Sequence, residues 1–168
     1  MGERIITANL LVPARRREVW RAWTTEAGIR TFFAPAGCID LRPDGPYEIY
    51  FDPVAEAGSR GGEGMRVLAV QEPELLSFTW NAPPSLPTVR AQRTSVLIRL
   101  DEAPGDRTRL QFHHSGWGNG GEWDQAFSYF EHAWLHIVLP RLIWRFINGP
   151  LDWNDPPASN TLADVPLE

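Results

Sequence analysis

The sequence predicts an α+β fold, in which a curved antiparallel sheet of about seven strands wraps around one long C-terminal helix. From Glu122 to Asn148 the chain offers a helical pattern of about 25 residues. Almost everything before this segment consists of short alternating stretches separated by glycine and proline, which is typical of strands and turns. Because the helix has an apolar face, the sheet is expected to cover it.

The apolar face of the long helix is mostly aromatic. At roughly 100° per residue, six side chains share one side: Trp123, Phe127, Phe130, Trp134, Ile137 and Val138. We therefore expect bulky rings to line the space between helix and sheet. Pro140 lies within the same segment and removes one helical hydrogen bond, which predicts a kink.

The N-terminal part is expected to form one strand followed by two short helices. Alternating apolar residues predict the strand over 5–12, which ends at a proline. The spacing of Val19 and Trp23 is helical, and Thr25 can cap a second short helix that runs towards Phe32.

Three hairpins are expected in the middle of the chain. They pair 37–41 with 47–51, 64–70 with 75–80, and 95–100 with 108–114. Turn sequences such as Pro43-Asp44-Gly45-Pro46 separate the paired segments. The segments 52–63 and 81–93 are predicted to be loops.

The length of 168 residues favours a single domain. We expect this domain to comprise residues 1–149 and a proline-rich tail to follow over 150–168, held against the body by Leu151 and Trp153.

Composition excludes several classes of partner. The chain has 16 Arg, no Lys and 21 acidic residues, giving a formal charge of −5, so nucleic acid is not expected to bind. Cys38 is the single cysteine, which excludes an internal disulfide and fits a reducing compartment. No apolar run approaches the roughly 18 residues of a membrane span, and the first residues lack a signal-peptide core. A cytoplasmic location is expected, and association into a homodimer is left open.

Several short motifs occur in an order that resembles one branch of a known superfamily. These motifs are Val12-Pro13-Ala14, Val19-Trp20-Arg21-Ala22-Trp23-Thr24, Pro43-Asp44-Gly45, Glu74-Leu75-Leu76-Ser77-Phe78-Thr79-Trp80, Thr108-Arg109-Leu110, His114-Ser115-Gly116-Trp117 and Tyr129-Phe130-Glu131-His132-Ala133-Trp134. The chain resembles the START-like, or SRPBCC, superfamily, in the branch of homologues of the activator of the ninety-kilodalton heat-shock protein ATPase. The resemblance extends from about Ile5 to Leu142. It implies a helix-grip fold with a ligand cavity.

Thirteen residues are candidates for lining this cavity, chosen by strand alternation or helical phase. They are Trp23, Phe33, Tyr47, Ile49, Phe51, Phe78, Trp80, Phe112, His114, Trp117, Phe127, Phe130 and Trp134. A small apolar or aromatic molecule is the expected ligand, and it should be uncharged because only His114 in this set ionises near neutral pH. The alternative is an interior filled by these rings themselves.

His114 is the one candidate for catalysis. Strand alternation places it on the apolar face with Leu110 and Phe112. A neutral imidazole there can orient a ligand or act as a general acid or base. The competing interpretation is a histidine at the edge of the core whose hydrogen bonds are all satisfied.

Metal and nucleotide sites are not expected. His132 and His136 have the spacing of two ligands on one helical face, but they turn away from the apolar stripe and no third ligand is evident. The segment 116–121 matches G-x-G-x-x-G, yet the following helix leads into a proline-rich tail rather than a second parallel strand. We therefore expect no cofactor.

Binding of a small hydrophobic ligand is the function that the sequence favours. The first alternative is an enzyme similar to polyketide cyclases and aromatases, using the same cavity with His114 as acid or base. The second alternative is a module that interacts with a chaperone.

Overall fold

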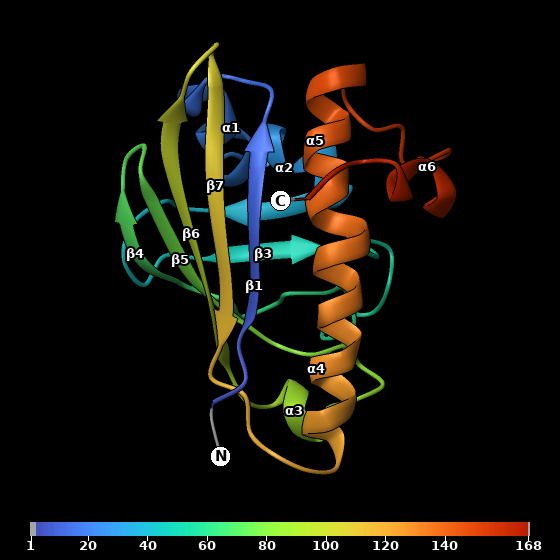
Figure 1. Cartoon of the computed structure of the whole chain (residues 1–168). Helices are drawn as coiled ribbons and strands as arrows, with labels where there is room; N and C mark the ends of the chain where they lie inside the picture. Colours follow the sequence, from blue (N-terminus) through green and yellow to red (C-terminus); the bar gives the residue numbers. More distant parts are fainter. Residues whose placement is uncertain (1–2, 168) are drawn as a thin grey trace.

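The computed structural model describes residues 3–167 and confirms an α+β fold with a long C-terminal helix against an antiparallel sheet (Figure 1). The strands are β1 (Ile6–Val12), β2 (Ala36–Ile39), β3 (Tyr47–Tyr50), β4 (Val67–Gln71), β5 (Leu75–Trp80), β6 (Thr94–Ala103) and β7 (Arg107–Ser115). The helices are α1 (Arg16–Thr24), α2 (Glu26–Phe32), α3 (Pro87–Arg90), α4 (Glu122–Ala133), the π-helical turn η1 (Trp134–Val138), α5 (Leu139–Asn148) and α6 (Ser159–Ala163).

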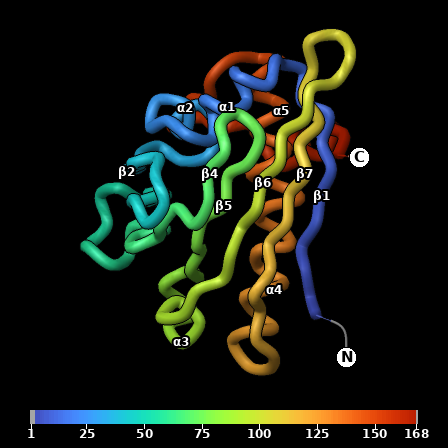
Figure 2. The backbone as a smooth tube through the Cα atoms, turned by 90° about the vertical axis from the view of Figure 1, so that its left-hand side faces the viewer, coloured from blue at the N-terminus to red at the C-terminus, as the bar shows by residue number. Residues whose placement is uncertain are grey.

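The seven strands are divided between two sheets rather than one. Five of them form a sheet in the order β1-β7-β6-β5-β4, and Figure 2 shows these strands side by side. The other two, β2 and β3, pair with each other in a separate sheet. An isolated bridge between Pro46 and Arg66 joins the hairpin to the segment before β4. The backbone N–H of Tyr47 donates to the carbonyl of Met65 at 2.9 Å. The hairpin is therefore attached next to β4, at one edge of the large sheet.

Strand alternation sets which side chains face the long helix. In β7, Leu110, Phe112 and His114 are buried, while the residues between them are half-exposed. The register places His114 opposite Ile6 of β1 and Val96 of β6. The inward position predicted for His114 follows directly from this period of two.

The long helix covers the predicted range but contains a π-helical turn. The backbone N–H of Leu139 donates to the carbonyl of Trp134, five residues earlier. This turn ends at Val138, two residues before Pro140, and α4, η1 and α5 continue as one column past the proline (Figure 1). Trp123 and Phe127, which were expected on the inward face, lie in the first half of the helix and are only half-buried.

Two short helices lie where the sequence predicted none. α3 occupies part of the expected loop 81–93, and α6 lies in the proline-rich tail. The first residues of the tail contact the C-terminal end of α2, where the N–H of Leu151 donates to the carbonyl of Thr31 at 2.9 Å. The indole N–H of Trp153 donates to the carbonyl of Arg30 at 2.7 Å. Leu151 and Trp153 thus make the contacts expected of them.

Gly28 permits the close approach of α1 and α2. A Cβ atom at this position would lie 2.1 Å from the carbonyl oxygen of Arg21 and 2.6 Å from the Cα atom of Ala22. Because both are backbone atoms, Gly28→Ala should force the helices apart and destabilise the protein by about 1–3 kcal/mol in urea unfolding. The exposed neighbour provides a control, since Ala27→Gly should cost no more than about 1 kcal/mol. Equal losses in the two variants would contradict the packing argument.

Candidate ligand-binding groove

Most of the interior between helix and sheet is filled by aromatic rings. The Trp134 ring lies 4.6 Å from that of Phe112 and 5.6 Å from that of Phe33, measured between centroids. Tyr47 stacks on Phe78 at 4.2 Å, and its hydroxyl donates to the carbonyl of Trp23 at 2.6 Å. This density favours the filled interior that the sequence analysis weighed against a cavity.

Two adjoining hollows remain at the side of the sheet where the long helix faces β3 and β5. The helix hollow has a volume of about 260 Å³ and is lined by Phe33, Phe51, Trp80, Tyr129, Phe130, Ala133, Trp134, Ile137, Val138 and Arg141. The loop hollow has a volume of about 150 Å³ and is lined by Phe51, Asp52, Ser59, Arg60, Gly61, Trp80, Asn81, Ala82, Pro83, Pro84, Arg90, Tyr129 and Phe130. The two hollows are neighbours because they share four lining residues, and together we call them the groove.

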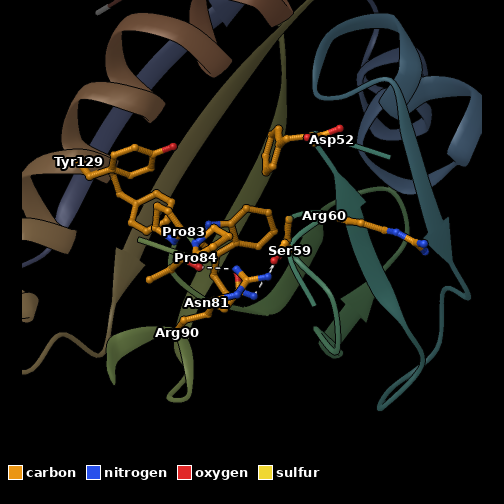
Figure 3. A pocket seen from close by; sticks show the side chains of 13 residues that line it. Asp52, Ser59, Arg60, Asn81, Pro83, Pro84, Arg90 and Tyr129 are labelled. Carbon is orange, nitrogen blue, oxygen red and sulfur yellow. Dashed lines mark hydrogen bonds between the residues drawn. The ribbon is translucent and has the colours of Figure 1, made fainter. Parts of the chain in front are cut away.

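Each hollow of the groove, taken alone, is small for a ligand site and is partly open to solvent. Each hollow lies below the roughly 300 Å³ at which typical small-molecule pockets begin. Two large side chains at its mouth remain accessible, with Phe51 47% and Tyr129 52% exposed. Figure 3 shows Tyr129 on the side of α4 and Asp52 on the opposite side. Exposed apolar rings on both sides of an opening are typical of a binding surface.

Arg90 of α3 holds the loop wall of the groove in place. Its guanidinium donates to the carbonyl of Gly61 at 2.9 Å, to that of Gly58 at 2.6 Å and to that of Ala82 (Figure 3). Burial lowers the pKa of Arg90, and the nearby Glu63 carboxylate opposes this effect. The Arg90 donors are therefore directed at the backbone, so this side chain builds the wall rather than contacting a ligand.

Glu63 closes the same loop from the inside. Its carboxylate accepts hydrogen bonds from the backbone N–H groups of Gly58 and Arg60. Burial alone would raise the pKa of Glu63, but these hydrogen bonds, one from Gly61 and the charge of Arg90 lower it below its ordinary value. Arg60 itself points away from the groove and donates to the carbonyl of Ala55 (Figure 3).

Trp80 forms the floor shared by both hollows. Its ring lies 5.8 Å from Phe33 and 5.7 Å from Trp134, between centroids. Its indole N–H is buried and has no hydrogen-bond partner among the described residues. The floor is thus apolar and rigid, with one donor left unused.

His114 lies outside the lining of the groove, in a complete hydrogen-bond network. The indole N–H of Trp134 donates to His114 Nδ1 at 3.0 Å, which makes Nδ1 an acceptor and puts the proton on Nε2. Nε2 then donates to the Thr94 hydroxyl at 2.6 Å, and that hydroxyl donates to the carbonyl of Trp80 at 3.3 Å. Desolvation by burial lowers the pKa of His114 to about 3. The imidazole is neutral at physiological pH and fully engaged.

The structure separates the thirteen candidate residues into three groups. Those that line the groove are Phe33, Phe51, Trp80, Phe130 and Trp134. Those buried elsewhere in the core are Trp23, Tyr47, Ile49, Phe78, Phe112 and His114. The last two, Trp117 and Phe127, are half-buried and contact each other at 5.3 Å near the start of α4. Alternation placed Tyr47, Ile49, Phe78, Phe112 and His114 inward, as the structure has them, whereas Phe51 lies beyond the end of β3 and is 47% exposed. Alternation could not show which inward side chains border open space.

The groove lining also includes residues that were not among the thirteen candidates, and three of them, Tyr129, Arg141 and Arg90, bear on its chemistry. Tyr129 and Arg141 lie on the long helix four and eight residues from Ala133, so a wider apolar stripe would have included them. No sequence pattern indicated a role for Arg90, because the loop carbonyls that it binds come from distant segments of the chain.

His132 and His136, on the outer face of the long helix, are exposed, and their rings stack with centroids 5.2 Å apart. Within residues 3–167, no three side chains of His, Cys, Asp or Glu gather as a metal site would require. Over the same range, the helices are too short or too polar to cross a bilayer.

Comparison with solved structures places this fold among helix-grip proteins. CalU16 from Micromonospora echinospora matches with a TM-score of 0.63 and 24% identity, over 90% of this chain and 79% of that one. The Aha1 dimer from Colwellia psychrerythraea matches with a TM-score of 0.66 and 15% identity, over 87% of this chain and 98% of that one. An HSP90 activator from Plasmodium falciparum matches with a TM-score of 0.64 and 13% identity, over 89% of this chain and 98% of that one. No curated protein matched the sequence.

The antiparallel sheet and the long C-terminal helix form a helix-grip fold, as the resemblance implied. The family model described as Activator of Hsp90 ATPase homolog 1-like protein matches residues 13–141, most of the chain. The protein therefore belongs to this family, and the resemblance to the branch of heat-shock protein activator homologues is confirmed.

Proposed function

We propose that the protein binds a small molecule with an apolar, ring-containing body in the groove between the long helix and the sheet. The observation that carries the proposal is the mainly apolar lining of the helix hollow around Trp80, together with the half-exposed rings of Phe51 and Tyr129. Aromatic walls favour offset or edge contacts with ligand rings. The modest volume favours a ligand of one or two fused rings, or one that widens the groove by moving Tyr129.

The enzyme alternative is not favoured by the geometry. It assigned the acid or base role to His114, which is buried beside Thr94 and Trp134 and does not border the groove. The chaperone alternative rests on relatives under 25% identical, which share the fold. A homodimer, the form named for the Colwellia relative, and a cytoplasmic location remain proposals that light scattering and cell fractionation can test.

Phe130 offers the most direct test, because it lines both hollows and is 7% exposed. Calorimetric titration with 2-(1-naphthyl)ethanol, an uncharged aromatic probe, should show saturable binding. Phe130→Trp should weaken this binding by about tenfold, since the larger indole fills the space that the probe needs.

Phe127→Trp is the matched control, because Phe127 lies three residues away on the same helix and outside the groove lining. It should change the affinity by less than about twofold. If the wild-type protein gives no saturable signal, ligand binding in this groove is the wrong function. A pull-down would then test the chaperone alternative.

A further inference from the structure

We propose that the Arg141 end of the groove receives the carboxylate of an amphipathic organic acid, whose apolar body lies along the groove. This inference rests on the proposed binding function and adds the chemical class of the ligand. It replaces the expectation of an uncharged ligand, which assumed that His114 was the only ionisable side chain facing inward.

The helix side of the groove is a straight row that ends in a charge. Tyr129, Ala133, Ile137 and Arg141 follow one another at intervals of four residues, and all four line the helix hollow. The two ends of the row lie about 18 Å apart along the helix axis. The groove is therefore elongated, with an open aromatic mouth at Tyr129 and a single cation at the other end.

Arg141 has no anionic partner in the part of the chain that the structure describes. It is half-buried, and its Nε is enclosed without a hydrogen-bond acceptor. The one contact recorded for its guanidinium is with the face of the Trp153 ring, 5.3 Å from the ring centroid. Of the other arginines with enclosed Nε atoms, Arg4 and Arg16 form salt bridges through their terminal nitrogens, whereas Arg145 lies over the Phe146 ring and, unlike Arg141, does not line the groove. An enclosed cation that lacks such a bridge is unfavourable, and an incoming anion would relieve this cost.

The tail positions the guanidinium. Trp153 is anchored to α2 by its hydrogen bond to the Arg30 carbonyl, and its ring covers one face of Arg141. Stacking fixes the plane of the guanidinium and leaves its edge, which carries the N–H donors, available to a ligand. Burial also lowers the pKa of Arg141, which agrees with a partly desolvated site.

The charge balance favours a carboxylate over a phosphate. Arg141 is the single charged residue that lines the helix hollow, so one negative charge is neutralised and a second would stay unpaired. The fork of N–H groups on a guanidinium matches the two oxygens of a carboxylate in a bidentate pair. The other groups that line the helix hollow are apolar, apart from the Trp80 N–H and the Tyr129 hydroxyl.

The test compares three probes with one ring system: 1-naphthaleneacetic acid, 2-(1-naphthyl)ethanol and 1-naphthyl phosphate. Calorimetry on the wild-type protein should show the acid binding about tenfold more tightly than the alcohol, with the phosphate weaker than the acid. Arg141→Met should bring the ratio of acid to alcohol affinities to about one. Arg145→Met, one turn further along α5 and outside the groove lining, should keep the wild-type ratio.

Each result decides between the two proposals. If the alcohol binds as tightly as the acid, or if Arg141→Met keeps the ratio, the carboxylate site is wrong while the groove remains a binding site. Tighter binding of the phosphate would overturn the assignment of a carboxylate. If no probe binds, the proposed function itself fails. Should Arg141→Met not fold, as judged by circular dichroism, Arg141→Gln replaces it with the same expected ratio.

Discussion

Trp134→Ala should lower the free energy of unfolding by about 3–5 kcal/mol, the usual cost of removing a large ring from a core. Trp134 is 1% exposed and contacts the rings of Phe33, Trp80 and Phe112. The truncation would also leave His114 Nδ1 without its donor. Urea unfolding monitored by circular dichroism measures the loss, and a value under about 1 kcal/mol would contradict the central position of this ring.

Two further variants separate the contributions at Trp134. Trp134→Phe keeps most ring contacts but removes the indole N–H, so it should cost about 1–3 kcal/mol through the unsatisfied imidazole nitrogen. His132→Ala changes an exposed residue on the opposite face of the same helix. It should stay within about 0.5 kcal/mol of the wild type.

Acidification should destabilise the protein through His114. Desolvation by burial holds its pKa at about 3 in the folded state, against an ordinary value of 6.5. Between these two pH values the unfolded chain binds a proton that the folded chain does not. Stability therefore falls as the pH falls through this window, by about 1.4 kcal/mol per pH unit. Over the whole window the loss amounts to several kcal/mol.

His114→Gln isolates this contribution from that of the carboxylates. Glutamine does not titrate, and its amide can still donate to Thr94 and accept from Trp134. The variant should be less stable than the wild type at pH 7.5, and the difference should shrink steadily towards pH 4.5. Urea unfolding at four pH values measures both curves, and parallel curves would show that His114 does not carry the acid sensitivity.

The class of fold and the order of its elements could be predicted from the amino-acid sequence alone. A period of two in 108–114 placed Leu110, Phe112 and His114 on the buried face, because successive side chains in a strand point to opposite sides. A period near 3.6 identified the whole long helix and placed Phe130 and Trp134 inward. These are local regularities of the backbone, so they can be read without knowing what lies across the interior.

The position of the remaining open space depends on tertiary packing, which sequence patterns do not show. Trp23, Tyr47 and Phe78 point inward as predicted, yet they pack against other rings and enclose no cavity. Arg90 reaches carbonyls about 30 positions away in the chain, and Arg141 meets Trp153 from the tail. The π-helical turn before Pro140 also changes the phase that a regular helix would give to Arg141. Periodicity reports the direction of a side chain, whereas a groove and its charge depend on which distant side chains fill the volume opposite.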